Sequence, residues 1–548
     1  MKKLKPLHDW LPMKYIQLKK LPELLVWVIL SLTSTWANAG NDAQSCDALR
    51  NFKELNTIIQ KISHIKSNEV RSDGFSMPAH CLIQGEMFKR IGHDNVGYSI
   101  GFELRMPLTW NHRFVFQGGG GVDGVLRPAL GALRPGVIPA LSQGAAVVSS
   151  DMGHQGSSNR DARFGLDSQA RIDWGYNALD KVTLISKEIM RHFYGELPQF
   201  AYFIGASGGG RQGMILAQRF PKHFDGIVTG APILEQHLAQ IGSIQMLQEF
   251  TVIAPKNENG ERVLSKSFSD SDLKLIAAGV MRRCDQLDGI VDGLIENYAA
   301  CEYSVKELQC KNEKNDACLS AEQVHAFDKV MAGPRSSNGT LLYPPIPWDS
   351  IIGEESWRAN MIGSSPTGIS NGSKSTNQSI KYVFMTPPDP NLDYLKFDLE
   401  RDAEKLMASA KFSASNDVNY AGFKERNGKH LVYVGMGDPL INPAGVIRWY
   451  QQLAKANEGL SETQKFARLF IVPGMSHTTG GRALDVFDPV SAIYDWVENN
   501  RAPEELIATG SAFPGRKRAI CMYPKIAKYK GTVDGSADHP SNFQCEMP

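Results

Sequence analysis

The sequence lacks an excess of charge of either sign. Lys and Arg together number 59 and Asp and Glu number 58, so the 548-residue chain has a formal net charge of +1. This balance gives no electrostatic reason to expect a nucleic acid as partner. Cysteine is also scarce, at eight residues, which excludes a disulfide miniprotein. The shares of hydrophobic residues (42%) and charged residues (21%) are those of a folded globular protein.

Long hydrophobic runs are absent beyond the first 39 residues. Residues 1–20 carry six lysines, residues 24–30 form an apolar run, and Ala37 and Ala39 precede Gly40. This pattern predicts a secretory signal peptide over residues 1–39, cleaved after Ala39. A membrane anchor is the alternative, but about 20 apolar residues are needed to cross a bilayer. We therefore expect an exported protein, periplasmic or extracellular, with no membrane partner after signal cleavage.

Export implies that the cysteines form disulfides, because the compartments outside the cytoplasm are oxidising. Eight cysteines allow 105 connectivities. Pairing between sequence neighbours closes the shortest loops and therefore costs the least entropy. The hypothesis is four bridges: Cys46/Cys81, Cys284/Cys301, Cys310/Cys318 and Cys521/Cys545. The sequence has no CxxC…CxxC or HExxH pattern, which argues against a zinc site.

Short apolar segments alternate with helical segments in the first half of the chain. Residues 98–106 alternate with period two, which is typical of a strand. Residues 114–116 and 145–148 are continuous apolar runs, as in parallel strands that are covered on both faces. A helix is expected over residues 178–194. Alternating strands and helices predict an α/β fold around a central sheet.

The middle of the chain has a different character. Residues 233–417 contain two of the proposed cysteine pairs, an acidic loop and a stretch rich in Ser, Gly and Asn. The buried-strand pattern returns at residues 429–434 and 468–472. We interpret residues 40–232 and 418–548 as one core that is interrupted by an inserted domain, residues 233–417.

A nucleophile motif stands between a predicted strand and a predicted helix. Residues 201–204 are apolar, Gly205-Ala206-Ser207-Gly208-Gly209 follows, and residues 211–220 read as a helix. This is the GxSxG elbow, in which a strained turn exposes the serine Oγ and the next N–H points at the oxyanion. The alternative is a Gly-rich turn with an incidental serine. The flanking strand and helix favour Ser207 as nucleophile and Gly208 as an oxyanion donor.

Three further segments fit the same chemistry. Residues 114–116 end in the Gly-rich loop 117–121, which is where hydrolases of this kind place a second oxyanion N–H. Asp438 and His477 each follow an apolar strand downstream of Ser207, in the order serine, acid, histidine. His477 would accept the serine proton, and Asp438 would orient the imidazole.

These residues resemble the tannase and feruloyl esterase family. The likeness covers about residues 46–545 and rests on residues 117–121, 164–167, 203–213, 218–221, 225–228, 230–232, 284–301, 474–481 and 523–529. It implies an α/β-hydrolase core with a lid inserted after Pro232. It also implies the triad Ser207, Asp438 and His477, with an oxyanion hole formed by the N–H groups of Gly121 and Gly208.

The chain departs from the family pattern in two places. The family usually has a disulfide between cysteines that flank the nucleophile and the histidine, where this chain has Ala206 and Thr478. The terephthalate monoester hydrolases of the family grip a substrate carboxylate with a lid Arg and stack on a lid Phe. The matching stretch, residues 370–382, contains neither. Because a guanidinium is the natural partner of a carboxylate, we expect that this enzyme does not recognise that group.

An acidic loop in the inserted segment is a candidate metal site. Asp285, Asp288 and Asp292 lie within eight residues, with glycines between them. Hard oxygen ligands on a tight loop suit Ca²⁺, although a solvated acidic loop is the alternative. The family resemblance implies structural calcium, bound by those three carboxylates and by the backbone carbonyls of Ile290 and Leu294.

The predicted function is an exported serine esterase that acts on esters of aromatic hydroxycinnamic or hydroxybenzoic acids. Its substrate would be a small aromatic ester, cleaved through an acyl-enzyme on Ser207. Two alternatives remain open at this point. One is hydrolysis of terephthalate monoesters, and the other is a non-catalytic, calcium-stabilised binding protein that keeps the fold.

Overall fold

A computed structural model describes residues 46–92, 95–134, 136–364, 370–531 and 533–548. The predicted signal peptide, residues 1–39, lies outside the described residues. The described residues belong to one unit by their internal contacts. No helix in the described ranges has the length and apolar character that crossing a membrane requires.

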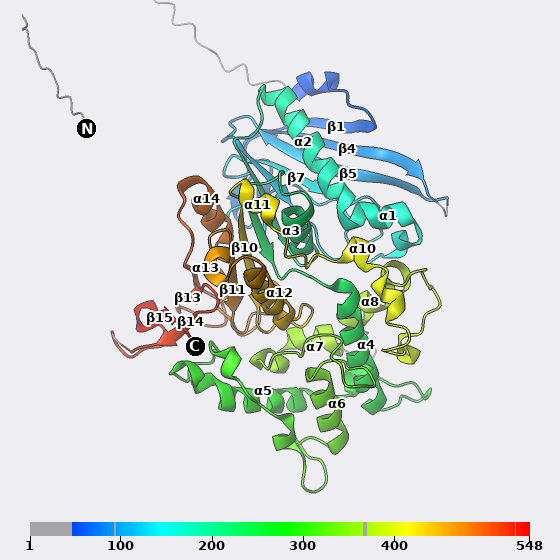
Figure 1. The fold of residues 1–548 in the computed structure, drawn as a ribbon, viewed down its shortest axis with the longest axis vertical. Coiled ribbons are helices and arrows are strands. Elements are labelled where there is room, and N and C mark those ends of the chain that lie inside the picture. Colours follow the sequence, from blue (N-terminus) through cyan, green and yellow to red (C-terminus); the bar gives the residue numbers. More distant parts are fainter. Residues whose placement is uncertain (1–45, 93–94, 135, 365–369, 532) are drawn as a thin grey trace, which may run out of the picture. The chain divides into compact units, whose positions relative to one another are not determined.

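The described chain is built on a mixed sheet of nine strands (Figure 1). Their order is β1-β4-β5-β7-β6-β8-β9-β10-β11. The strands from β7 to β11 in this order run parallel, and β1, β4 and β5 extend the sheet as antiparallel strands. Their bounds are β1 Thr57–Ile65, β4 His80–Ile91, β5 Gly97–Pro107, β6 Arg113–Gln117, β7 Ala146–Ser150, β8 Phe200–Ala206, β9 Gly226–Gly230, β10 Lys429–Gly435 and β11 Ala467–Val472.

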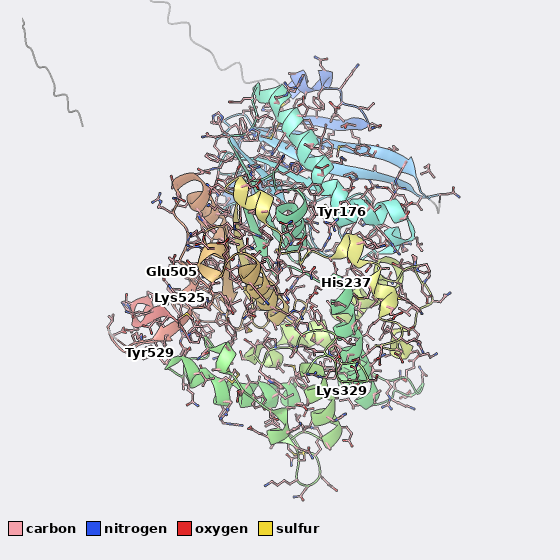
Figure 2. All side chains as sticks on the ribbon, in the orientation of Figure 1. Tyr176, His237, Lys329, Glu505, Lys525 and Tyr529 are labelled. Carbon is pink, nitrogen blue, oxygen red and sulfur yellow. A yellow bond between two sulfur atoms is a disulfide. The ribbon has the colours of Figure 1, made fainter. Side chains whose placement is uncertain are left out.

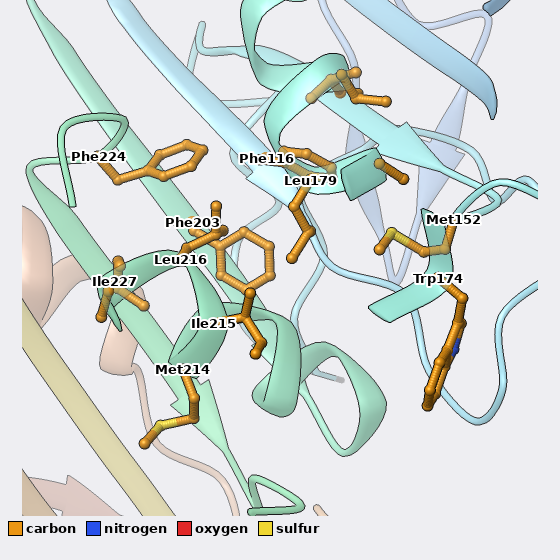
Figure 3. Packing of buried hydrophobic residues seen from close by; sticks show 14 of the residues in the cluster. Phe116, Met152, Trp174, Leu179, Phe203, Met214, Ile215, Leu216, Phe224 and Ile227 are labelled. Carbon is orange, nitrogen blue, oxygen red and sulfur yellow. The ribbon is translucent and has the colours of Figure 1, made fainter. Parts of the chain in front are cut away.

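Successive residues of each central strand enter opposite hydrophobic layers, because side chains alternate across a sheet. Phe116 and Phe203 pack on one face with Ile227 and with residues of the helix after the nucleophile (Figure 3). Val115 and Tyr202, their neighbours in sequence, join the layer on the other face. Both faces of the central strands are therefore buried, which explains their continuous apolar runs.

Helices cover both faces of the sheet. One layer contains residues of α2 (Ala178–Tyr194), α3 (Gly208–Arg219) and α12 (Pro443–Ala456), and the other contains residues of α14 (Pro489–Asn499). The shorter helices of this part are α1 Ser168–Ile172, α11 Ala421–Glu425 and α13 Leu460–Thr463. Three short strand pairs complete it: β2 Arg71–Ser72 with β3 Phe75–Ser76, β12 Glu505–Ala508 with β13 Arg518–Cys521, and β14 Ile526–Tyr529 with β15 Phe543–Glu546.

The inserted segment, residues 233–417, is helical. Its first part has a hydrophobic core of its own, in which Phe250, Phe268 and Phe327 pack edge to face or stacked. Lys329, which is labelled in Figure 2, lies on one helix of this part. Its Nζ pairs with Glu249 Oε1 on another helix, 2.6 Å away. The helices are α4 Gln236–Ile253, α5 Asp270–Cys284, α6 Ala321–Met331, α7 Glu355–Met361, α8 Asn371–Ser379, α9 Glu404–Met407 and α10 Ala410–Ser413.

The second part of the inserted segment packs on the sheet layer. Phe384, Phe397 and Leu406 belong to the same hydrophobic cluster as the central strands. Phe384 also meets Trp174 edge to face, with ring centroids 6.4 Å apart. The second part of the inserted segment is thus held to the core by apolar contacts as well as by the chain itself.

Most expected elements of the core are present with small shifts. The predicted helix over residues 178–194 is α2 with the same bounds, and the predicted strands are β5, β6, β7, β8, β10 and β11. Helix α3 begins at Gly208, three residues before the predicted start, because the glycines after Ser207 are already helical. The antiparallel strands β1 and β4 were not predicted.

The disulfide hypothesis is confirmed. The structure contains the bridges Cys46–Cys81, Cys284–Cys301, Cys310–Cys318 and Cys521–Cys545, and leaves no free cysteine among the described residues. The first joins the N-terminal turn to β4, and the last joins β13 to β15.

Candidate active site

Ser207 occupies the turn between β8 and α3. Its backbone has φ 61° and ψ −119°, a left-handed conformation that is rare for a residue with a side chain. Such strain is characteristic of a nucleophile elbow, where it lifts the hydroxyl out of the turn. The Ser207 N–H donates to the carbonyl of Gly230 at the end of β9, 2.8 Å away, which ties the turn to the sheet.

Asp438 and His477 reach Ser207 from loops at the carboxyl ends of β10 and β11. His477 Nε2 lies 2.9 Å from Ser207 Oγ, and His477 Nδ1 lies 2.9 Å from Asp438 Oδ2. The loops meet because β10 and β11 are parallel neighbours and end at the same edge of the sheet. The three residues predicted from sequence therefore form one chain of hydrogen bonds.

Asp438 is held rigidly beneath the imidazole. Its side chain is buried, and its Oδ1 accepts the backbone N–H groups of Leu440 and Ile441, both at 2.9 Å. Burial lowers the pKa of His477, but the charge and the hydrogen bond of Asp438 outweigh burial and raise the pKa above the usual 6.5. The carboxylate thus stabilises the imidazolium that forms when the serine loses its proton.

The raised pKa of His477 predicts the acid limb of the pH profile. Protonated His477 cannot accept the Ser207 proton, so kcat/KM should fall as pH falls through this pKa. We expect the half-maximal point above pH 6.5. Asp438→Asn should move the limb to lower pH, since it removes the charge that stabilises the imidazolium. Initial rates on a neutral ester between pH 4 and 9 measure both, and a wild-type limb centred below pH 6.5 would contradict the assignment.

Two backbone N–H groups lie close to the serine in the chain or at the cavity wall: Gly208 follows Ser207, and Gly121 lines the same cavities. Gly208 opens α3, so its N–H belongs to the first helical turn, which has no intrahelical acceptor and carries the positive end of the helix dipole. The N–H of Gly121 has no acceptor among the described residues. Gly121 has φ 64°, and a Cβ there would stand 2.5 Å from the Asn159 carbonyl oxygen, so both conformation and space require glycine.

The Gly-rich loop is fastened by a side chain of α3. Gln212 is fully buried, and its Oε1 accepts the Gly119 N–H at 3.1 Å. Its Nε2 donates to Asp123 Oδ2 at 2.8 Å. Burial raises the pKa of Asp123 to about 7. Gln212 therefore connects the Gly-rich loop to the helix that follows the nucleophile. Sequence reasoning missed Gln212 and Asp123, since nothing local marks them.

Removal of the Gln212 link should lower kcat more than it weakens substrate binding. In Gln212→Leu, the Gly119 N–H and the Asp123 carboxyl lose their partner, and the loop can move away from the transition-state position. We expect kcat to fall about tenfold with KM nearly constant, a fraction of the loss from removing an oxyanion donor itself.

The matched control is Gln218→Leu. Gln218 lies on the same helix and donates to the Ser415 carbonyl, away from the loop. Its kcat should stay near wild type. An equal loss of kcat in both variants, or a loss confined to KM, would contradict a positioning role for Gln212.

A cavity of about 320 Å³ opens beside Ser207. Core loops contribute Gly121, Ser207, Asp438 and His477 to its wall. The inserted segment supplies most of the rest, and this part is largely apolar: Ile233, Met246, Val330, Met331, Tyr343, Ile346, Ile351, Ile352, Trp357 and Met361. The inserted segment thus covers the nucleophile with a surface suited to a flat apolar group.

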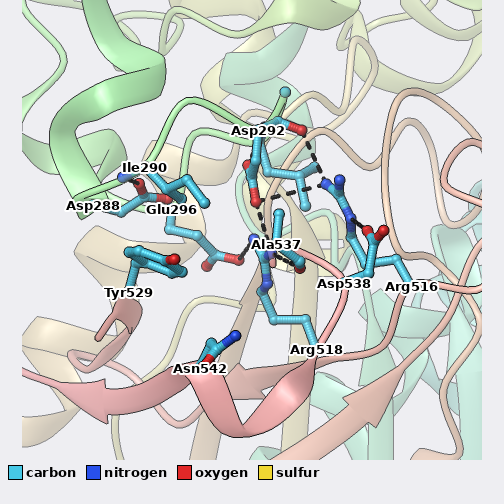
Figure 4. A network of polar contacts seen from close by, with 12 residues as sticks. Asp288, Ile290, Asp292, Glu296, Arg516, Arg518, Tyr529, Ala537, Asp538 and Asn542 are labelled. Atoms are coloured by element: carbon cyan, nitrogen blue, oxygen red, sulfur yellow. Dashed lines mark hydrogen bonds and ion pairs between the residues drawn. The ribbon is translucent and has the colours of Figure 1, made fainter. Parts of the chain in front are cut away.

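The acidic loop of the inserted segment packs against the C-terminal strands (Figure 4). Asp288 is fully buried, and its Oδ2 has no hydrogen-bond partner. Asp285 accepts the backbone N–H of Gly293, and Asp292 pairs with Arg518 at 2.7 Å. Among the described residues, no group of three or more His, Cys, Asp or Glu is gathered closely enough to hold a metal ion. Calcium binding therefore stays a prediction.

A strained serine elbow, joined by hydrogen bonds to a histidine and a buried aspartate at the ends of parallel strands, defines a serine hydrolase of the α/β-hydrolase fold. The profile of the family described as "Tannase and feruloyl esterase" matches residues 87–546. The chain belongs to this family of carboxylic ester hydrolases.

Known relatives extend over nearly the whole chain. A mono(2-hydroxyethyl) terephthalate hydrolase from Piscinibacter sakaiensis is 36% identical, with 92% of each chain covered. A probable feruloyl esterase B-2 from Aspergillus flavus is 30% identical over 75% of this chain and 77% of that protein. The crystal structure of feruloyl esterase B from Aspergillus oryzae superposes with a TM-score of 0.78 at 22% identity, covering 92% of this chain and 100% of the other. The latter likeness supports the fold.

Proposed function

We propose that this chain hydrolyses esters of aromatic acids, in the manner of feruloyl esterases and tannases. The observation that carries the proposal is the hydrogen-bonded row Ser207–His477–Asp438 at the wall of an apolar cavity. The cavity is large enough for one substituted benzene ring and its linker. Family membership and the feruloyl esterase relatives support the same class of substrate.

The reaction follows from the geometry. Ser207 Oγ attacks the ester carbonyl carbon while its proton passes to His477 Nε2, and the carbonyl oxygen becomes an oxyanion that accepts from the N–H groups of Gly121 and Gly208. The C–O bond to the alcohol breaks, and His477 returns the proton to the leaving oxygen. Water then attacks the acyl-enzyme with His477 again as base, and releases the acid and free Ser207.

A panel of esters tests the proposal. Methyl ferulate, methyl gallate, methyl protocatechuate and a terephthalate monoester should be compared by kcat/KM with the purified mature chain. We expect hydrolysis of at least one hydroxycinnamate or hydroxybenzoate ester well above that of terephthalate. No hydrolysis of any of them, with no covalent labelling of Ser207 by a fluorophosphonate, would favour a non-catalytic binding protein.

Terephthalate monoesters are the second candidate. The Piscinibacter sakaiensis relative that is named for this reaction supports it. The stretch of residues 370–382 offers no Arg, but the exposed Arg160 of a core loop lines the same cavity and carries a guanidinium that suits a carboxylate. A kcat/KM on the monoester comparable to that on methyl ferulate would make this the better assignment.

We also propose export. Four disulfides are consistent with folding in an oxidising compartment. The first 39 residues have the signal-peptide pattern. N-terminal sequencing of the secreted protein should find Gly40 as the first residue, and an intact N-terminus would contradict cleavage.

Structural calcium in the acidic loop is a further proposal. Asp285, Asp288 and Asp292 would bind by carboxylate, and Ile290 and Leu294 by backbone carbonyl. The unpartnered, buried Asp288 oxygen fits a cation, since a buried acceptor without a donor is costly. In Figure 4, Asp292 pairs with Arg516 and Arg518, and Glu296 pairs with Arg518. Among the described residues, Asp288 forms no ion pair that would balance its charge. The ion would hold the loop against β13. Its role would be structural, and it would take no part in the reaction.

Removal of calcium should therefore reduce stability. A ligand at a hundredfold excess over its Kd adds about 2.7 kcal/mol to the free energy of unfolding. We expect EGTA to lower the Tm, calcium but not magnesium to restore it, and Asp288→Asn to abolish the calcium-dependent part. A Tm that EGTA leaves unchanged, with no calcium by atomic absorption, would contradict the site.

A further inference from the structure

A second cavity lies at Ser207, apart from the one beneath the inserted segment. Its volume is about 300 Å³. Four residues line both cavities: Gly121, Asn159, Ser207 and His477. The remaining wall of the second cavity comes from the core alone: Gln117, Gly118, Gly119, Gly120, Arg127, Ala132, Leu133, Ile204, Gly205, Ala206 and Thr478. The reacting serine and histidine therefore stand between two separate spaces.

The two spaces differ in chemistry. The first is faced by aromatic and aliphatic side chains of the inserted segment. The second is faced by the backbone of the Gly-rich loop, by small side chains such as Ala206 and Thr478, and by Arg127. An aromatic acyl group gains more by burial in the first, so the second remains for the other half of the ester, the alcohol.

Arg127 gives the second cavity a positive charge. The residue is exposed, and one of its terminal nitrogens would stand 3.9 Å from a Cβ at Gly120. Within the described chain its guanidinium forms no ion pair or hydrogen bond. Asp123, the acid whose charge it feels, is buried behind the Gly-rich loop and bonded to Gln212. The guanidinium of Arg127 is thus available to bind a ligand in the cavity.

We propose that the second cavity is the subsite of the leaving alcohol, and that Arg127 makes it selective for alcohols that carry a carboxylate. The inference rests on the proposed ester hydrolysis. A guanidinium donates two parallel N–H bonds to a carboxylate, whereas a neutral hydroxyl or amide accepts less strongly. His477, which lines this cavity, protonates the alcohol oxygen there when the ester C–O bond breaks.

A matched pair of esters tests the subsite. Carboxymethyl ferulate, the ester of ferulic and glycolic acids, has an anionic alcohol, and carbamoylmethyl ferulate, from glycolamide, is its neutral isostere. The wild-type protein should prefer the anionic ester in kcat/KM. In Arg127→Gln, the ratio of kcat/KM between the anionic and the neutral ester should fall about tenfold, as expected for the loss of one charge-assisted pair at an exposed site. The kcat/KM of this variant on carbamoylmethyl ferulate, relative to that on methyl ferulate, should stay as in the wild type.

Arg501→Gln is the control, because it removes the same charge from an exposed position outside both cavities. It should leave the ratio between the two esters unchanged. Arg127→Lys keeps the positive charge but loses the planar guanidinium, so its preference for the anionic ester should lie between those of the wild type and Arg127→Gln. Melting curves check that each variant folds.

Two results would overturn the subsite: equal wild-type kcat/KM on both esters, or a preference that survives Arg127→Gln. Activity on methyl ferulate separates this failure from that of the proposed function. A protein that cleaves methyl ferulate but ignores the carboxylate refutes the subsite alone, and a protein that cleaves none of the three refutes the hydrolysis itself.

Discussion

Ser207→Ala and, separately, His477→Ala are expected to lower kcat by at least about 10³-fold. The first removes the nucleophile, and the second removes the base 2.9 Å from it. Because the two act as one unit, the double variant should be little slower than either single one. Steady-state rates on the best ester of the panel measure the loss, and a fluorophosphonate should label the wild type but not Ser207→Ala.

Surface variants of the same types serve as controls. Ser491→Ala on α14 and His192→Ala on α2 change exposed residues outside both cavities, and should keep wild-type turnover. All four proteins should melt cooperatively. Near-wild-type turnover in Ser207→Ala or His477→Ala would show that the hydrogen-bonded residues Ser207, His477 and Asp438 are not the catalytic triad.

Ala206→Cys combined with Thr478→Cys is expected to form a disulfide and to raise the Tm strongly. Each residue is adjacent in sequence to a member of the Ser207–His477 pair, and both line the second cavity. A bridge needs Cα atoms less than about 7 Å apart. The loop from residue 206 to residue 478 is long, so the loss of unfolded-chain entropy permits a gain of up to about 5 kcal/mol, with measured gains usually smaller.

Mass spectrometry of the oxidised double variant measures the bridge, and differential scanning calorimetry measures the gain before and after reduction. Activity on methyl ferulate should survive, because the bridge joins loops that already meet. Thr478 has φ 64°, and cysteine adds no new backbone strain there beyond that of threonine. Each single cysteine variant is the control and should show no gain. Two free thiols in the folded, oxidised double variant would mean that these loops are not neighbours.

The triad Ser207, Asp438 and His477 could be predicted from the sequence because the patterns that mark these residues are local. The elbow at Ser207 stands between a strand and a helix, and Asp438 and His477 each end an apolar strand. Parallel strands bring their carboxyl ends to one edge, so three strand-end positions far apart in sequence become neighbours in space. The same reasoning explains the disulfides, since short loops favour pairing between sequence neighbours.

The parts that escaped prediction depend on long-range packing. Gln212 reaches Gly119 across 93 residues of sequence, and no local pattern marks a glutamine as the fastening of a glycine loop. Strands β1 and β4 add to the sheet as an antiparallel extension. All residues of β1 are exposed or half-buried, and such an edge strand leaves only a faint hydrophobic signal in the sequence. The later inserted residues, such as Phe384, join the core layer because only the folded sheet offers them an apolar face.

The sequence by itself determined the α/β class, the four disulfides, and the residues Ser207, Asp438 and His477 as the reactive set, because each follows from short-range pattern or strand polarity. Only the tertiary structure decided how these groups are surrounded. It placed an apolar cavity on one side of Ser207 and a polar cavity with Arg127 on the other, since side chains from distant segments converge there. Short-range pattern carries no information about such convergence, which the packing of whole layers against one another produces.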